Sequence, residues 1–244
     1  MKSVACMFLI AVVGFSGTAF AQQSGPIEKG RGLAWGSLGF QGDLGGSINS
    51  SGIGVVDGMR AEIDANTWGE RYDAALIFRL GGAYNLTARS QLTGDVTWEQ
   101  SESDRTESGL IDGQPLNVKF GDYQGTAIDV GYRYFVGGLS KIKPFVGGAL
   151  GYQRIQDITI SFDSAPFSEA DVPFYDDSWG FAWRLGTGML VDINERLGWH
   201  VTVDLKYASQ LSDQSGLGTV GFERINDTGN RWTLPIMGGM HLKF

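Results

Sequence analysis

The chain ends on residues 232–244, which read WTLPIMGGMHLKF. Even positions, from Trp232 to Phe244, are apolar or glycine, while the odd positions include Thr233, His241 and Lys243. A period of two over this length indicates a β-strand with one apolar face and one mixed face. A transmembrane strand needs about ten residues that alternate in this way. The stretch therefore predicts the closing strand of an outer-membrane barrel, with an amphipathic strand of a soluble sandwich as the alternative.

The first 21 residues have the three parts of a secretory signal peptide. A basic start at Lys2 precedes the apolar run 4–13, and Ala19-Phe20-Ala21 forms an A-x-A cleavage site. The apolar run is too short to cross a bilayer as a helix. We expect a cleaved leader at 1–21 and a mature chain that begins at Gln22. The single cysteine, Cys6, lies in the leader, so no disulfide or thiol site is expected in the exported protein.

Composition favours a β-rich chain of one domain, residues 22–244. Glycine accounts for 37 of 244 residues, aromatics make up 12%, and no run of about eighteen apolar residues follows the leader. The formal charge is −8, and the leader carries no acidic residue. So acidic a surface disfavours nucleic acid and anionic lipid as partners, and it favours cations or basic partners.

Segments that alternate between apolar and polar residues recur eight times. They lie at 33–41, 72–85, 92–99, 126–134, 144–155, 179–193, 199–207 and 232–244. The first segment has an ambiguous face, because Leu33 and Trp35 lie on one side while Leu38 and Phe40 lie on the other. A β-bulge would explain this change of face.

The connections between these segments alternate in length. Long polar stretches at about 42–71, 101–122, 156–178 and 209–230 alternate with short turns at 86–90, 136–143 and 194–198. An antiparallel meander places all long loops at one end, and outer-membrane barrels have short periplasmic turns and longer extracellular loops. The pattern predicts an all-β protein, an eight-stranded antiparallel up-and-down transmembrane β-barrel with four long extracellular loops.

Aromatic residues on the apolar faces also sort by end, as expected for the two interfacial belts of a membrane protein. Beside the long loops lie Tyr72, Trp98, Tyr152, Trp179 and Tyr207, and beside the turns or terminus lie Tyr84, Tyr134, Trp199 and Phe244.

The segment 133–155, RYFVGGLSKIKPFVGGALGYQRI, resembles the hairpins of OmpA/OmpX-like outer-membrane β-barrel proteins. Its aromatic strand end, short turn and Pro-Phe-Val-Gly sequence carry the resemblance, together with the strand rhythm and the terminal Phe244. The resemblance implies an eight-stranded barrel of the porin family type in the outer membrane of a Gram-negative bacterium. It also implies that the outer-membrane insertion machinery reads the terminal strand, whose apolar face comprises Trp232, Ile236, Met240, Leu242 and Phe244. Pro235 fits this strand poorly, so we expect it where pairing has already stopped.

If the apolar faces contact lipid, eight charged side chains point into the lumen. These are Arg79, Asp95, Asp129, Arg133, Arg184, Asp192, Asp204 and Lys206. Eight strands leave room for side chains or one small ligand, and buried charges in that space must be paired. We expect a salt-bridged plug. A gated ion path, which needs the plug to rearrange, is the alternative.

No catalytic, cofactor or metal site is predicted. His200 and His241 are expected on the luminal face near the turn end, where hydrogen bonding is favoured over metal binding by a two-ligand site. No histidine falls at the loop end of a strand, which argues against a hydrolase or a lipid A-modifying enzyme. The acidic stretch Ser161–Ser178 could hold divalent cations that bridge to lipopolysaccharide phosphates, although it lacks a chelating loop.

These features predict a monomeric outer-membrane barrel with a structural or surface-interaction role. Its expected partners are outer-membrane lipids, lipopolysaccharide and the insertion machinery. A small pore or narrow transporter is the alternative function, followed by a membrane hydrolase.

Overall fold

A computed structural model describes residues 29–56, 58–137, 141–165, 167–209, 211, 222, 224–227 and 229–244. The predicted leader at 1–21 and the predicted mature start at Gln22 lie outside these residues. Within the described part of the chain, no helix is long and apolar enough to cross a membrane.

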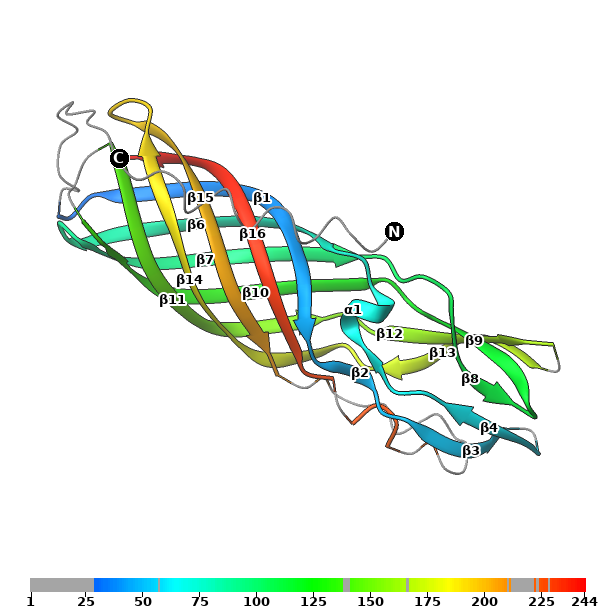
Figure 1. The fold of residues 1–244 in the computed structure, drawn as a ribbon. Coiled ribbons are helices and arrows are strands. Elements are labelled where there is room, and N and C mark those ends of the chain that lie inside the picture. Colours follow the sequence, from blue (N-terminus) through cyan, green and yellow to red (C-terminus); the bar gives the residue numbers. More distant parts are fainter. Residues whose placement is uncertain are drawn as a thin grey trace.

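Eight long antiparallel strands form a closed barrel in the order β1-β16-β15-β14-β11-β10-β7-β6. The predicted fold class is therefore confirmed, and the terminal strand closes the barrel by pairing with β1 from Leu33↔Lys243 to Gly45↔Trp232. Figure 1 shows the C-terminus at the end of the barrel that carries the short turns. The strands are β1 (Gly32–Gly45), β6 (Ala75–Thr87), β7 (Ser90–Ser101), β10 (Tyr123–Phe135), β11 (Ile142–Ile155), β14 (Ser178–Asp192), β15 (Leu197–Ala208) and β16 (Arg231–Lys243).

The strand β1 alternates without a bulge over the stretch where the sequence was ambiguous. Leu33 and Trp35 point into the barrel and are buried, whereas Leu38 and Phe40 are exposed on the outer wall. Its pairing with β16 is continuous from Leu33 to Asp43. The two inward side chains are apolar because they pack in a luminal cluster near the turns, so the face never changes.

Pro235 lies within the paired part of β16, so the expectation that pairing has stopped there is wrong. It pairs with Gln41 of β1. On the other side, the pairs of β15 with β16 pass from Val203↔Ile236 directly to Lys206↔Thr233. The ladder is interrupted beside the proline because proline has no N–H to donate.

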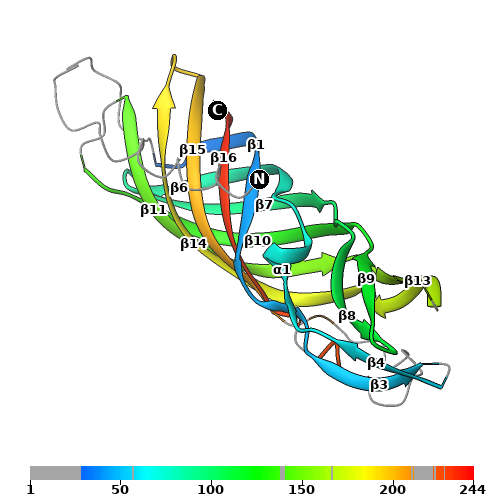
Figure 2. The same ribbon diagram turned by 45° about the vertical axis from the view of Figure 1, so that its right-hand side comes forward.

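The sequence indicated that the long connections are polar loops. In the structure they instead contain further β-strands, which form a second β-structure outside the barrel. Figures 1 and 2 show these strands continuing beyond one end of the barrel and spreading to one side of its mouth. A six-stranded sheet has the order β13-β12-β9-β8-β4-β3, and β2 pairs with β5. The elements are β2 (Ser47–Asn49), β3 (Gly52–Val56), β4 (Met59–Ile63), β5 (Asn66–Thr67), α1 (Trp68–Arg71), β8 (Thr106–Ile111), β9 (Gln114–Phe120), β12 (Ile158–Ser164) and β13 (Phe167–Tyr175).

The described residues between the barrel strands at 46–74, 102–122, 156–177 and 209–230, which we call the cap, have their own hydrophobic core. Side chains from all four connections contribute to it, including the fully buried Ile48, Trp68, Ile158 and Phe174. Tyr72, which we expected on the lipid face, is buried in this core and donates a hydrogen bond to Gly121 O at 2.7 Å. The cap is therefore a second packed unit at one side of the barrel mouth (Figure 2).

Candidate functional site

The middle of the lumen holds five of the predicted charges in one cluster. Arg79 Nη1 lies 2.9 Å from Asp204 Oδ2, and its Nε lies 3.7 Å from Asp95 Oδ1. Arg184 donates to Asp95 Oδ2 at 2.5 Å and lies 3.4 Å from Asp129 Oδ2. The five residues come from β6, β7, β10, β14 and β15. Arg79 and Asp95 lie on adjacent strands, whereas the other three ion pairs cross the lumen and link strands that are not neighbours.

Nearer the cap, a second cluster surrounds Glu99, whose side chain is fully buried. Lys206 is ion-paired with its Oε1. Gln41 donates to Oε2 at 2.7 Å, Gln153 donates to Oε1 at 2.9 Å, and the Tyr123 hydroxyl lies 3.4 Å from Oε2. Several donors around one carboxylate offset the cost of burying its charge.

Arg231 joins this cluster to the base of the cap. Its Nε and Nη2 contact the two carboxylate oxygens of Asp43 at 2.5 and 3.0 Å. Its guanidinium lies 4.2 Å from the ring centroid of Tyr123 and 5.2 Å from that of Trp68. A bidentate pair held between two aromatic rings is well suited to a buried arginine. The arginine therefore links the last barrel strand to the cap core.

A third cluster lies at the turn end around Asp192. Lys143 is ion-paired with Asp192, Lys243 Nζ lies 3.0 Å from its Oδ2, and His241 Nε2 lies 3.7 Å from its Oδ1. The second histidine, His200, lies within 2.6 Å of the Ser37 hydroxyl. Both histidines are buried on the luminal face near the turns.

Arg133 lies between these clusters without joining their ion pairs within the described residues. It donates to Gln91 Oε1 at 3.3 Å, and its guanidinium lies 4.2 Å from the Phe145 ring centroid and 5.2 Å from that of Trp35. The two rings belong to the luminal apolar cluster of Leu33, Trp35, Phe135, Phe145 and Leu190. The single charge network expected from the sequence is therefore three clusters plus one arginine held against aromatic rings.

Five further charged residues belong to these clusters and were missed: Asp43, Glu99, Lys143, Arg231 and Lys243. Glu99 and Lys243 lie on the inward faces of the predicted segments 92–99 and 232–244, and Lys143 directly precedes the segment 144–155. Applying the alternation to every charged residue would have found these three. Asp43 and Arg231 lie at the margins of segments that the sequence indicated as loops. The structure places both residues in barrel strands, because β1 extends to Gly45 and β16 begins at Arg231.

A luminal cavity of about 40 Å³ lies beside Arg79, Thr202 and Asp204. A buried water needs about 10–15 Å³ of space of this kind, so this cavity has room for at least one water molecule.

Outside the lumen, the acidic stretch Ser161–Ser178 forms much of the β12–β13 hairpin. Two of its carboxylates pair with arginines, Asp163 with Arg105 at 2.5 Å and Asp177 with Arg154. The hydrogen bond from Arg154 lowers the pKa of the exposed Asp177 carboxyl. Across the described residues, no group of three or more metal-ligating side chains gathers.

No protein-family model and no curated protein matches this chain. Among solved structures it is similar to Neisserial surface protein A, with a TM-score of 0.48, 11% identity and coverage of 87% of this chain and 97% of that one. For OprG from Pseudomonas aeruginosa the TM-score is 0.47, identity 18% and coverage 89% and 97%. For the outer membrane protease OmpT from Escherichia coli the corresponding values are 0.47, 8%, 91% and 99%. These likenesses concern the arrangement of strands and carry no activity to this chain.

The barrel's own features define its class. Its outer wall carries exposed apolar residues such as Leu38, Val130, Leu150 and Leu185, while the charged residues of its strands face inward except for Arg154 near the cap. A closed barrel leaves no unpaired strand edge, which is what a β-structure needs in order to span a bilayer. The chain is an outer-membrane β-barrel of eight strands, the architecture that its resemblance to OmpA/OmpX-like proteins implied.

Proposed function

We propose that the barrel is a closed anchor that displays the cap at the cell surface, with a structural or surface-interaction role and no enzymatic activity. One observation carries this proposal: ion pairs cross the lumen at mid-barrel, while the four connections build a cap with its own core beyond one end of the barrel. A path for ions would require the charge clusters to rearrange. A closed anchor needs no such movement.

The outer face of the cap sheet offers a surface for a protein partner. Ile53 and Val55 on β3 and Leu110 on β8 are exposed there, and Glu62 lies between Ile53 and Leu110 in the pairing. Apolar side chains among charged ones are typical of protein interfaces. The excess of acidic residues in the connections favours a basic partner over an acidic one.

The remaining partners are proposed on general grounds. Lipids and lipopolysaccharide surround the wall, the insertion machinery reads the terminal strand, and divalent cations bridge exposed cap carboxylates to lipopolysaccharide phosphates. The barrel acts as a monomer in this proposal. Non-enzymatic function is supported by the position of the two histidines of the chain, His200 and His241, which are buried at the end opposite the cap.

Single-channel recording in planar bilayers tests the closed anchor. We expect little or no steady conductance from the intact protein, and a measurable current or loss of folded protein on Arg79→Ala or Arg184→Ala. The exposed Arg60→Ala serves as control, because it removes an ion pair with Glu62 on the cap surface without touching the lumen. A large, stable conductance that neither luminal substitution alters would contradict the closed anchor and support a pore.

The pore alternative has one observation in its favour. Several buried polar atoms in the lumen have no hydrogen-bond partner within the described residues, among them Thr202 Oγ1, Arg184 Nη1 and His200 Nδ1. Such groups favour hydration, because leaving them dry costs about 1–3 kcal/mol each. A hydrated lumen is a step toward a narrow pore, and the same recording separates the two functions.

A further inference from the structure

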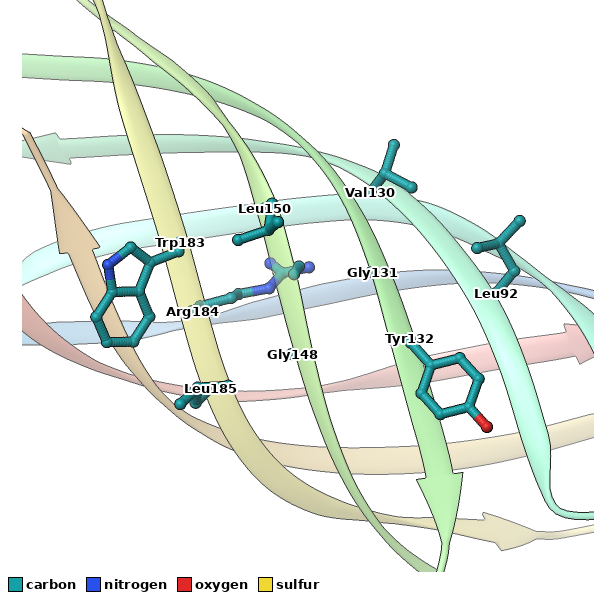
Figure 3. A pocket seen from close by; sticks show the side chains of 10 residues that line it. Leu92, Val130, Gly131, Tyr132, Gly148, Leu150, Trp183, Arg184 and Leu185 are labelled. Carbon is teal, nitrogen blue, oxygen red and sulfur yellow. The ribbon is translucent and has the colours of Figure 1, made fainter.

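The lipid-facing wall carries a groove across β7, β10, β11 and β14. It has a volume of about 550 Å³ and opens outward from the barrel. Figure 3 shows Trp183 and Leu185 on one side and Tyr132 and Leu92 on the other, with bare backbone at Gly148 between them. The pairing explains this shape, because Gly148 lies opposite Tyr132 on one neighbour and opposite Leu185 on the other.

The missing side chain at Gly148 is what hollows the wall. Neighbouring outward positions on the same strand carry Val146 and Leu150, both exposed. A carbon added at Gly148 would lie 2.8 Å from the end of the Leu185 side chain, so even a small side chain would begin to fill the groove. The groove is apolar and faces the bilayer, so an acyl chain is the group available to occupy it.

A cation lies below the groove at the periplasmic rim. Arg89 is in the turn that precedes β7, only three residues before Leu92, which corresponds to roughly 10 Å along a strand. Its carbonyl accepts a hydrogen bond from Phe135 N at 2.8 Å, which places the turn against the end of β10. The Arg89 side chain is exposed, and its guanidinium has no ion-pair partner among the described residues.

The wider rim has the same sign of charge. The exposed cations there are Lys29, Arg31, Arg89, Lys141 and Arg196, and among the described residues of the turns the one exposed acid is Glu195. The net negative charge of the chain therefore hides an asymmetry, because its acidic residues concentrate in the connections at the opposite end. A phosphate at the periplasmic interface would meet a basic rim.

We propose that this groove and Arg89 form a binding site for an anionic phospholipid of the periplasmic leaflet. One acyl chain lies in the groove over Gly148, and the headgroup phosphate pairs with Arg89. The phenols of Tyr132 and Tyr134, exposed on the same wall, lie at the level between chain and headgroup, where amphipathic rings are favoured. The site is independent of whether the lumen conducts.

Native mass spectrometry of the detergent-extracted full-length protein tests the site with two probes, phosphatidylglycerol and phosphatidylcholine of equal chain length. We expect the protein to retain phosphatidylglycerol preferentially. Arg89→Gln should lower that binding about fivefold, the equivalent of one arginine at an anionic membrane surface, and bring it to the phosphatidylcholine level.

Gly148→Leu should abolish retention of both lipids, and Gly148→Ala, which adds one carbon, should reduce it partly. The matched control is Gly238→Leu, which adds the same side chain to the lipid face of β16 outside the groove and should leave retention unchanged. Equal retention by Gly148→Leu and Gly238→Leu overturns the groove as the site. Equal binding of the two lipids by the unmodified protein overturns the role of Arg89. Dimers that disappear in Gly148→Leu would show that a second copy of the chain occupies the groove, which also overturns the proposal.

Discussion

Arg79 on β6 and Asp204 on β15 meet across the lumen at 2.9 Å, although β1 and β16 separate their strands in the wall. The pair therefore acts as a cross-tie between opposite sides of the barrel. Arg184 and Asp95 form a second tie from β14 to β7, with β11 and β10 between those strands. Asp95 connects the two ties, because it pairs with Arg184 in the second and its Oδ1 lies 3.7 Å from Arg79 Nε in the first. The four residues thus hold the barrel as one unit at mid-depth.

Breaking one tie should destabilise the barrel strongly. Arg184→Ala leaves Asp95 and Asp129 without their principal cation, and removing one partner of a buried pair costs about 3–5 kcal/mol. Urea unfolding in lipid vesicles should show this loss. The exposed Arg60→Ala should change the free energy of unfolding by about 1 kcal/mol or less. Equal losses of unfolding free energy in the two variants would mean that water already hydrates and screens the charges of the central cluster.

How much of this arrangement could be predicted follows from the strand period. Alternation alone places Asp95, Asp129 and Asp204 inside, because each strand has only two faces and one must contact lipid. Depth followed from counting along each strand. The pairing partners did not follow, because they depend on the stagger of eight strands around the barrel, which no single segment encodes.

The cap escaped prediction for a different reason. Its strands are short and rest on residues such as Ile48, Ile158 and Phe174 that are separated by polar residues, so each connection looks hydrophilic when taken alone. The core exists only when the four connections meet. Tyr72 illustrates the consequence, because its alternation with Leu76 matched a lipid-facing position while tertiary packing buried it in the cap.

The direction of the strand faces can be tested by a pair of adjacent substitutions. Val203 lies on the outer wall and Thr202 is buried on the luminal side. Val203→Arg should cost about 2–4 kcal/mol of folding free energy in vesicles, because it places a charge near the bilayer midplane. Thr202→Arg should avoid this lipid penalty. Similar costs that persist in bilayers of different thickness would contradict the assigned faces.

The closing strand makes a prediction about assembly. Phe244 is bonded to Gly32 in both directions, with N–O distances of 3.0 and 3.1 Å, and its exposed ring faces outward at the rim. Deleting Phe244 should lower the amount of heat-modifiable protein in the outer membrane while leaving export intact. Fractionation followed by electrophoresis of unheated samples measures this. Normal assembly of the truncated chain would show that the last residue is dispensable.

Alkaline pH should open the cap through Tyr72. Burial raises the pKa of this phenol, so the folded cap holds its proton more tightly than the unfolded chain does. The stabilisation is complete below the unfolded-state pKa of about 10, and it declines as pH rises beyond that value. The protection factors of the cap amides, which compare the exchange rate with the base-catalysed intrinsic rate at the same pH, should fall above this pH in the unmodified protein. Tyr72→Phe should lose about 1 kcal/mol at neutral pH with the hydrogen bond to Gly121, yet show a weaker alkaline step.

The last prediction concerns whether the cap unfolds separately from the barrel. Phe174 is fully buried in the cap core, 5.4 Å from the Phe120 ring and 4.8 Å from the Tyr175 ring between centroids. Phe174→Ala should destabilise the cap by about 3–5 kcal/mol through the cavity that it leaves. The barrel keeps its own ladders and ion pairs, so its heat-modifiability should persist while trypsin gains access to Arg71, which is buried in the folded cap. Phe40→Ala on the lipid-facing wall removes the same atoms without opening a buried cavity, and should leave the cap resistant. Simultaneous loss of cap and barrel in Phe174→Ala would show that the two form one cooperative unit.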